Sequence, residues 1–492
     1  MDVYLGLDIG TTNIKMTLAD GEGKVVESRS HPLGMSSPGP AWAEQDPEDW
    51  WTGVTELLSS VPGNVRVVGI GLSGQMHTLV PVDRDGRVLR KAILWCDQRT
   101  AAECAEAEAA LGGESRVVEM TGNLIYPGFT LPKILWIRKH EPEVYRKIAT
   151  CYIAKDYIGW RLTGERASEW SDASGSACWD VSARKWRSDL LSALGVDEGW
   201  LPPVKGSAEI RGILRPELAR RFGWGETKVI CGGADNAVSA FGLGVASPGD
   251  CMISIGTSGT VLAITGSTAP DPTGRLHFFN SVLPGQSYYM GCMLAAAASL
   301  NWFRDVAGRD LTWDDIGKAV EETPPGAGGM LWLPYLNGER TPHRNPNARG
   351  VLYGLSSMID RRHVFRAVME GITYGLRDSF ELVRAATPVK RVIMAGGGAK
   401  SAVWRKMTAS VMGFPVSVPE TEEGGAYGAA MLAALGGGLS PDDVRGWTRI
   451  LETVEPDDAE KKTYDRGYLQ FQALYRDLRE RFDATAHNTG EQ

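Results

Sequence analysis

Alternating hydrophobic and polar positions predict two strand–turn–strand units, one at the start of each half of the chain. In the first, apolar residues alternate over 3–18 on both sides of a Gly-Thr-Thr-Asn turn at 10–13. Residues 252–264 repeat this arrangement around a second Gly-Thr turn, and alternation of this kind is typical of half-buried strands. The tripeptide Ile-Gly-Thr at 9–11 recurs at 255–257, half of the 492-residue chain later. This spacing favours two like domains, with a chance tripeptide as the alternative.

Strand and helix signals alternate between and after these units. Asp46-Pro47 has the pattern of an N-cap followed by a first-turn proline, with apolar residues at helical spacing behind it. Short apolar strands are predicted at 65–72 and 392–395, and a long amphipathic helix over 464–482. We therefore expect an α/β fold with an N-terminal domain at 1–245, a C-terminal domain at 246–484 and a polar tail at 485–492.

Composition narrows the class of protein. The formal net charge is −8, from 52 Lys and Arg against 60 Asp and Glu, so no extended nucleic-acid-binding surface is expected. No basic secretory segment is visible at the N-terminus, and the small apolar stretch at 292–300 is too short to cross a bilayer. The seven cysteines are odd in number and include no C-x-x-C pair, which favours a reducing compartment. We expect a cytoplasmic protein without nucleic-acid or membrane partners.

Three glycine-containing turns are candidates for binding phosphate: Gly10-Thr11-Thr12, Gly256-Thr257 and the Gly-Gly-Gly run at 396–398. Glycine lets backbone N–H groups approach phosphate oxygens closely, and threonine hydroxyls add donors. One such turn alone is more typical of a plain hairpin, whereas two related turns with a third loop favour nucleotide binding. The chain contains no G-x-x-x-x-G-K-[ST] loop and no H-R-D with D-F-G set, which excludes P-loop and protein-kinase mechanisms.

Two carboxylates follow predicted strands, where α/β proteins bind ligands. Asp8 ends the first strand, and it is either a magnesium ligand beside phosphates or a turn-capping residue. The matching position in the second unit is Ser254, so the two units differ in chemistry. Asp235 precedes a small-residue helix, either as a catalytic base or as an N-cap. We expect the dipole of that helix to lower the pKa of Asp235.

Two further side chains have competing interpretations. His77, in Gln75-Met76-His77 after another predicted strand, either hydrogen-bonds a substrate hydroxyl or is a satisfied loop histidine. Trp302, in an alanine-rich apolar segment, either abuts a purine or packs in the core.

The chain resembles the FGGY family of carbohydrate kinases over nearly its whole length, and within it the xylulokinases. Two family signatures carry the resemblance, the first over 128–140 and the second over 350–355 with His363, Ala367 and Glu370. The xylulokinase-like segments are Ser-Gly-Gln-Met-His at 73–77, Ser-Asp-Ala-Ser-Gly at 171–175 and Gly-Glu-Arg-Thr-Pro at 338–342. Three positions depart from the xylulokinase pattern and bear on sugar preference: Thr78, Cys96 and Ala234.

The resemblance implies two ribonuclease H-like domains of the actin and hexokinase ATPase type, flanking a catalytic cleft. It implies transfer of phosphate from ATP, with Mg²⁺, to the terminal hydroxyl of D-xylulose. Asp235 would be the general base, Asp8 a catalytic residue and magnesium ligand, and Met76, His77, Asp235 and Asn236 the sugar site. The implied nucleotide site is Gly10, Thr11, Thr12, Lys15, Gly256, Thr257, Trp302, Gly397, Gly398, Lys400 and Ser401.

Alternatives stay open at this point. Another FGGY kinase, acting on gluconate, ribulose or a polyol, would share every phosphate motif. An actin- or chaperone-type ATPase would share the domain pair without needing His77 and Asp235. A homodimer is compatible with the resemblance.

Overall fold

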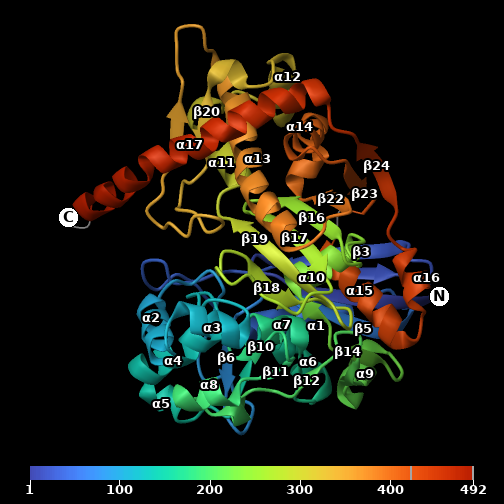
Figure 1. Ribbon diagram of the computed structural model, residues 1–492. Helices are drawn as coiled ribbons and strands as arrows, with labels where there is room; N and C mark the ends of the chain where they lie inside the picture. Colours follow the sequence, from blue (N-terminus) through green and yellow to red (C-terminus); the bar gives the residue numbers. More distant parts are fainter. Residues whose placement is uncertain (422–423, 490–492) are drawn as a thin grey trace.

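Two seven-stranded sheets with related strand orders form the framework of the protein. A computed structural model describes residues 1–421 and 424–489. The N-terminal sheet has the order β13-β14-β5-β1-β2-β3, with β15 beside β5, and the C-terminal sheet has the order β18-β19-β17-β16-β22-β23-β24. In Figure 1 strands β5 and β14 of the first sheet lie below β16, β17 and β22 of the second, with α10 and α15 between these strands.

The strands of the N-terminal sheet are β1 (Asp2–Ile9), β2 (Asn13–Ala19), β3 (Val25–Pro32), β5 (Arg66–Gly74), β13 (Ile210–Ile213), β14 (Lys228–Ile230) and β15 (Gly233–Ala234). Those of the C-terminal sheet are β16 (Asp250–Ile255), β17 (Gly259–Thr265), β18 (His277–Asn280), β19 (Ser287–Met293), β22 (Arg391–Ala395), β23 (Val416–Pro419) and β24 (Ile450–Val454). Shorter pairs are β4 (Glu44–Gln45) with β7 (Ala92–Ile93), β6 (Val80–Val82) with β8 (Thr150–Tyr152), β9 (Ser168–Glu169) with β12 (Val204–Lys205), β10 (Trp179–Asp180) with β11 (Lys185–Trp186), and β20 (Leu331–Leu333) with β21 (Val351–Tyr353).

The helices before the C-terminal sheet are α1 (Pro47–Ser59), α2 (Ala101–Ala110), α3 (Glu114–Thr121), α4 (Thr130–His140), α5 (Pro142–Tyr145), α6 (Ala154–Thr163), α7 (Trp170–Ser174), α8 (Ser188–Ala193), α9 (Pro216–Phe222) and α10 (Asp235–Gly242). The later helices are α11 (Ala297–Ala307), α12 (Trp313–Glu322), α13 (Arg361–Ala386), α14 (Ala402–Met412), α15 (Gly424–Gly437), α16 (Pro441–Arg445) and α17 (Asp458–Thr489), with the 3₁₀ turns η1 (Glu198–Trp200), η2 (Ala327–Gly329) and η3 (Gly397–Lys400).

Both predicted strand–turn–strand units are confirmed, and both lie at the same place in their sheets. Strand β1 pairs antiparallel with β2 and parallel with β5. Strand β16 pairs antiparallel with β17 and parallel with β22 in the same way. In the N-terminal sheet β5 pairs next with the parallel strand β14, and β14 pairs with the antiparallel edge strand β13. In the C-terminal sheet β22 pairs in the same way with the parallel strand β23, and β23 with the antiparallel edge strand β24. The repeat of sequence therefore corresponds to a repeat of topology.

Other local signals are also confirmed. Helix α1 begins where predicted, and the Asp46 side chain accepts a 3.0 Å hydrogen bond from Glu48 N. Helix α17 includes the predicted amphipathic stretch and extends to Thr489, so the first residues of the predicted polar tail continue the helix. The last three residues of that tail, 490–492, lie outside the described residues.

Helix α15 follows β23 in the chain yet packs on the N-terminal sheet, across β1 and β5. The approach is close enough to exclude side chains from the sheet beneath it. A Cβ on Gly6 would lie 1.8 Å from Ala426 O, and a Cβ on Gly71 would lie 1.8 Å from Ala429 O. Glycine at these two strand positions therefore permits the contact through which the two halves of the chain share one hydrophobic core.

Among the described residues, the longest apolar helices fall short of what a bilayer crossing requires.

Candidate functional site

The carboxyl ends of adjacent strands bring Asp8 and Asp235 to one edge of the N-terminal sheet. Asp8 is in register with Ser73 across β1 and β5, and Ser73 is in register with Gly233 across β5 and β15. Asp235 begins α10 two residues after Gly233. The two carboxylates are close enough that the charge of Asp8 raises the pKa of Asp235. This edge is where ligands bind in open α/β sheets.

Asp8 is a partly exposed carboxylate held by its neighbours in the sheet. Ser73 Oγ donates a 2.8 Å hydrogen bond to Asp8 Oδ1. Burial raises the pKa of Asp8, and the Ser73 hydrogen bond and the nearby Lys15 ammonium oppose that rise only in part. Helix α15 starts beside the other oxygen, because a Cβ on Gly425 would lie 2.4 Å from Asp8 Oδ2. Asp8 therefore lies where the C-terminal half of the chain meets the end of β1.

The expectation that the α10 dipole lowers the pKa of Asp235 is wrong. Burial, together with the negative charge of Asp8, raises that pKa from 3.8 to about 7. Asn236 N does donate a 2.7 Å hydrogen bond to Asp235 Oδ1, which lowers the pKa but does not offset the lost hydration. Near pH 7 the Asp235 carboxyl is consequently divided between its protonated and ionised forms.

Three of the four predicted sugar-site residues are in contact. Asn236 Nδ2 lies 3.2 Å from Asp235 Oδ1 and 3.6 Å from Met76 Sδ. Met76 is buried, whereas Asp235 and Asn236 are partly exposed. The fourth residue, His77, follows Met76 directly and is also partly exposed. The arrangement offers a carboxylate, an amide and an imidazole from two segments that are distant in sequence.

The imidazole of His77 has a defined orientation and protonation state. Its Nδ1 lies 2.7 Å from Gly175 O, and because a carbonyl only accepts, Nδ1 carries the proton. The ring stacks on Phe129, with centroids 4.4 Å apart. Burial holds the pKa of His77 well below 6.5, and the nearby charges of Lys133 and Arg340 lower it further. Neutral His77 therefore keeps a lone pair on Nε2 that accepts a hydrogen bond.

A loop of the C-terminal half approaches this site from the other side. Arg340 is near enough for its charge to lower the pKa of His77. Arg344 pairs with Glu114 at the start of α3, at 2.8 Å. Arg340 lies in the Gly-Glu-Arg-Thr-Pro segment, but the sequence alone does not place it, because a loop charge has no periodicity that shows which surface it faces.

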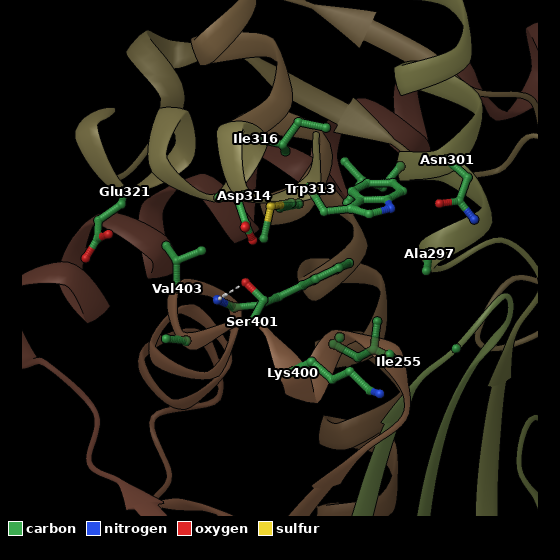
Figure 2. Close-up of a pocket in the computed structure, with 18 of the residues that line it drawn as sticks. Ile255, Ala297, Asn301, Trp313, Asp314, Ile316, Glu321, Lys400, Ser401 and Val403 are labelled. Atoms are coloured by element: carbon green, nitrogen blue, oxygen red, sulfur yellow. Dashed lines mark hydrogen bonds between the residues drawn. The ribbon is translucent and has the colours of Figure 1, made fainter. Parts of the chain in front are cut away.

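A cavity of about 850 Å³ lies beside the turn after β16, between α11, α12 and α14 (Figure 2). Six residues predicted to bind nucleotide line it: Gly256, Thr257, Gly397, Gly398, Lys400 and Ser401. The turn and the glycine run are in contact, since a Cβ on Gly396 would lie 2.7 Å from Ile255 O. Gly396 also has φ +78°, a backbone conformation that favours glycine. Two of the three candidate phosphate turns thus form one wall of a single cavity.

The aromatic residue at this cavity is Trp313 and not Trp302. Figure 2 shows Trp313 and Ile316 on one side of the cavity, with Lys400 and Ser401 on the other. Trp302 is absent from the lining, is 45% exposed and stacks on Trp332 with centroids 6.0 Å apart. Trp302 is therefore not packed in the core and is not part of the cavity lining. Sequence reasoning missed Trp313 because it is one of 16 tryptophans and begins a helix without any nucleotide motif.

The third candidate turn, Gly10-Thr11-Thr12, is ordered by side chains of the N-terminal half. Gln45 Nε2 donates to Thr11 O at 2.7 Å, and Trp95 Nε1 donates to Thr11 Oγ1 at 2.9 Å. The Thr11 hydroxyl therefore accepts from Trp95 and retains its own proton to donate. This turn and Lys15 do not line the 850 Å³ cavity; they lie at the sheet edge with Asp8.

Two departures from the xylulokinase pattern have structural partners. Thr78 is buried, and its Oγ1 donates to Gln75 Oε1 at 3.0 Å. Ala234 is buried, and its N donates to Ser171 Oγ at 2.9 Å. Cys96 is partly exposed, and burial raises the pKa of its thiol.

Comparison with known proteins decides the family. The model of the FGGY family of carbohydrate kinases, N-terminal domain, matches residues 3–242, and the C-terminal domain model of the same family matches residues 251–436. A xylulose kinase of Bacillus subtilis is 41% identical over 447 residues, which is 89% of each chain. The chain belongs to the FGGY family of carbohydrate kinases. It is therefore a sugar kinase, and ATP is its co-substrate.

Solved structures of this family share the whole fold. A ligand-bound xylulose kinase from Lactobacillus acidophilus matches with a TM-score of 0.93 and 26% identity, over 99% of this chain and 100% of that one. A gluconate kinase from the same organism matches with a TM-score of 0.91 and 26% identity, over 97% and 98%. The protein thus has the actin- and hexokinase-like ATPase fold predicted from the sequence, and the fold alone does not choose the sugar.

Proposed function

We propose that this FGGY kinase transfers the γ-phosphoryl group of ATP to the terminal hydroxyl of D-xylulose, giving D-xylulose 5-phosphate. The 41% identity to a xylulose kinase supports this acceptor. The observation that carries the chemistry is a partly exposed Asp235 at the ligand-binding edge, with its pKa raised to about 7. A general base works best when its pKa lies near the pH at which the enzyme operates.

Asp235 is the proposed general base. The sugar hydroxyl oxygen forms a bond to the γ-phosphorus, its proton passes to an Asp235 oxygen, and the bond to the bridging β–γ oxygen breaks to release ADP. Asn236 N fixes Asp235 Oδ1 by its 2.7 Å hydrogen bond. Asp235 Oδ1 is therefore held in place, and we assign Oδ2 as the oxygen that accepts the proton of the sugar hydroxyl.

The proposed sugar site combines donors and acceptors around this carboxylate. His77 Nε2 accepts a hydrogen bond from a sugar hydroxyl, because Nδ1 carries the proton. Asn236 Nδ2 donates to a sugar oxygen, and Met76 offers an apolar surface beside it. Asp235 contacts the hydroxyl that is phosphorylated.

The proposed nucleotide site uses both halves of the chain. Gly256, Thr257, Gly397, Gly398, Lys400 and Ser401 line the cavity that we assign to ATP. Trp313, on the opposite side of the cavity, offers a flat apolar surface for adenine. Gly10, Thr11, Thr12 and Lys15 lie at the sheet edge, where we assign them to the transferred phosphate.

The residues at Asp8 fit magnesium bound together with nucleotide. Mg²⁺ usually takes one or two carboxylates, with phosphate oxygens and waters completing its shell. Asp8 supplies one carboxylate, and the described residues contain no group of three or more His, Cys, Asp or Glu arranged to hold a metal by themselves. When bound, Mg²⁺ neutralises charge on the phosphates.

The deciding experiment measures ADP release with Mg-ATP and D-xylulose, D-ribulose, D-gluconate or xylitol. We expect kcat/KM for D-xylulose to exceed that of every other acceptor at least about tenfold. The gluconate kinase of the same fold makes D-gluconate the principal competitor. A higher kcat/KM for another acceptor would replace D-xylulose, and ATP hydrolysis unaffected by any acceptor would refute a sugar-dependent reaction.

A further inference from the structure

Lys133 is a fully buried lysine in the first turns of α4, next to the proposed sugar site. Its side chain is 0% exposed, and it forms no ion pair with any side chain that the structure describes. Lys133 Nζ instead donates to two backbone carbonyls, His77 O at 2.9 Å and Gly128 O at 2.7 Å. Removing an amine from water costs free energy. A local reason is therefore needed for why this buried amine binds two backbone carbonyls and no carboxylate of the described residues.

The backbone at His77 supplies that reason. His77 has φ +67°, in the left-handed region of backbone conformation that residues other than glycine rarely adopt. Its carbonyl oxygen also accepts a 3.1 Å hydrogen bond from Thr130 Oγ1. Lys133 and Thr130 therefore hold the same carbonyl from one helix, and this restrains a conformation that the chain would otherwise leave.

The same segment also restrains the imidazole. Phe129, directly before α4, stacks on the ring at 4.4 Å, while Gly175 O fixes Nδ1 at 2.7 Å. The ring and the carbonyl of His77 are thus both held, and only Nε2 is left to meet a ligand. Residues 129, 130 and 133 act on one target because helical spacing places them together.

We propose that Lys133 is a positioning residue for sugar binding, which holds the His77 carbonyl so that His77 Nε2 points at a sugar hydroxyl. This inference rests on the proposed function, in which His77 contacts the sugar. Lys133 acts through His77 and touches neither sugar nor ATP.

An amine suits this role over a range of pH. Burial lowers the pKa of Lys133 to about 7; Asp97, Cys96 and Cys104 oppose that shift, and Arg99 adds to it. The neutral amine still has two N–H groups, one for each carbonyl. The hydrogen bond to His77 is consequently kept on both sides of neutral pH.

The test compares Lys133→Met with His77→Asn and with the double variant, because asparagine tolerates the left-handed backbone. We expect Lys133→Met to raise the KM for D-xylulose about tenfold while kcat and the KM for ATP change less than about twofold. In the His77→Asn background, Lys133→Met should have little further effect on that KM. Lys139→Met is the matched control, because Lys139 lies on the same helix but is exposed and pairs with Glu106.

Each outcome is decisive. An unchanged sugar KM in Lys133→Met overturns the proposal, and so does a double variant whose effects multiply, since that indicates a general structural role. If His77→Asn alone leaves the sugar KM unchanged, the assignment of His77 as a sugar contact fails instead. Should Lys133→Met not fold, Thr130→Val removes the second hydrogen bond to the same carbonyl. It should then raise the sugar KM to a smaller extent, and no rise would overturn the proposal.

Discussion

The charge of Asp8 raises the pKa of Asp235, because strand β5 pairs both with the strand that carries Asp8 and with the short strand that ends before Asp235. Two carboxylates at one strand edge cannot both ionise as readily as either alone. This relationship connects the fold to the pH range in which the proposed base is available.

Replacing the proposed base should remove turnover and keep binding. We expect Asp235→Asn to lower kcat by roughly 10²–10⁴, the usual contribution of general-base catalysis. Calorimetric titration should show sugar and ATP affinities within a few-fold of those of the native protein. A near-normal kcat would show that Asp235 is not the base.

The pH dependence of kcat/KM should follow the ionisation of Asp235. A carboxyl must be ionised to accept a proton, so kcat/KM should rise with pH and level off above a midpoint near 7. In Asp8→Asn the charge that raises this pKa is absent, and the midpoint of the residual activity should move to lower pH. A midpoint near 4 in the native protein would contradict the assignment.

Replacement of Trp313 and of Trp302 should have different effects on ATP binding. Trp313 lines the cavity, so Trp313→Ala should raise the KM for ATP at least about fivefold and leave the sugar KM unchanged. Trp302→Ala is the matched control and should leave both constants near their native values, because Trp302 is outside the lining. The reverse result would assign adenine to Trp302.

The contact of α15 with β5 should be sensitive to one methyl group. A Cβ at position 71 would lie 1.8 Å from Ala429 O, so Gly71→Ala should destabilise the protein by roughly 1–3 kcal/mol or more. Gly69→Ala, on the same strand, places its Cβ 3.4 Å from Ala433 O and should change the melting temperature much less. Equal melting temperatures for the two variants would refute the close packing.

Stability should depend on pH through Lys133. Its pKa is about 7 in the folded protein against 10.5 for an ordinary lysine, so the unfolded chain binds more protons between these values. The contribution of Lys133 to the free energy of unfolding is therefore lowest below pH 7 and rises toward pH 10. The melting temperature of the native protein minus that of Lys133→Met should increase over this range. A constant difference would show that Lys133 is not buried as an amine with a lowered pKa.

Local patterns predicted the parts of the fold that local physics determines. Period-two alternation located both central hairpins, and Asp46-Pro47 located the start of α1. The strand ends also pointed to Asp8 and Asp235, because parallel strands share the edge at which they finish.

The parts that failed depend on contacts between distant segments. The pKa of Asp235 follows from burial and from Asp8, neither of which the α10 sequence reveals. The position of Trp313 opposite Lys400 requires α12 and α14 to pack together. Lys133 appears in a family signature, but its role depends on the backbone angle at His77.

The packing of α15 has a consequence for how the protein is made. The strands that it covers, β1 and β5, are synthesised well before α15 (Gly424–Gly437). One face of the N-terminal sheet, with the bare backbone at Gly6 and Gly71, stays uncovered until α15 has been made. The core of the nascent chain is completed only when α15 packs on this sheet. Until then the exposed face of the sheet can aggregate or bind chaperones.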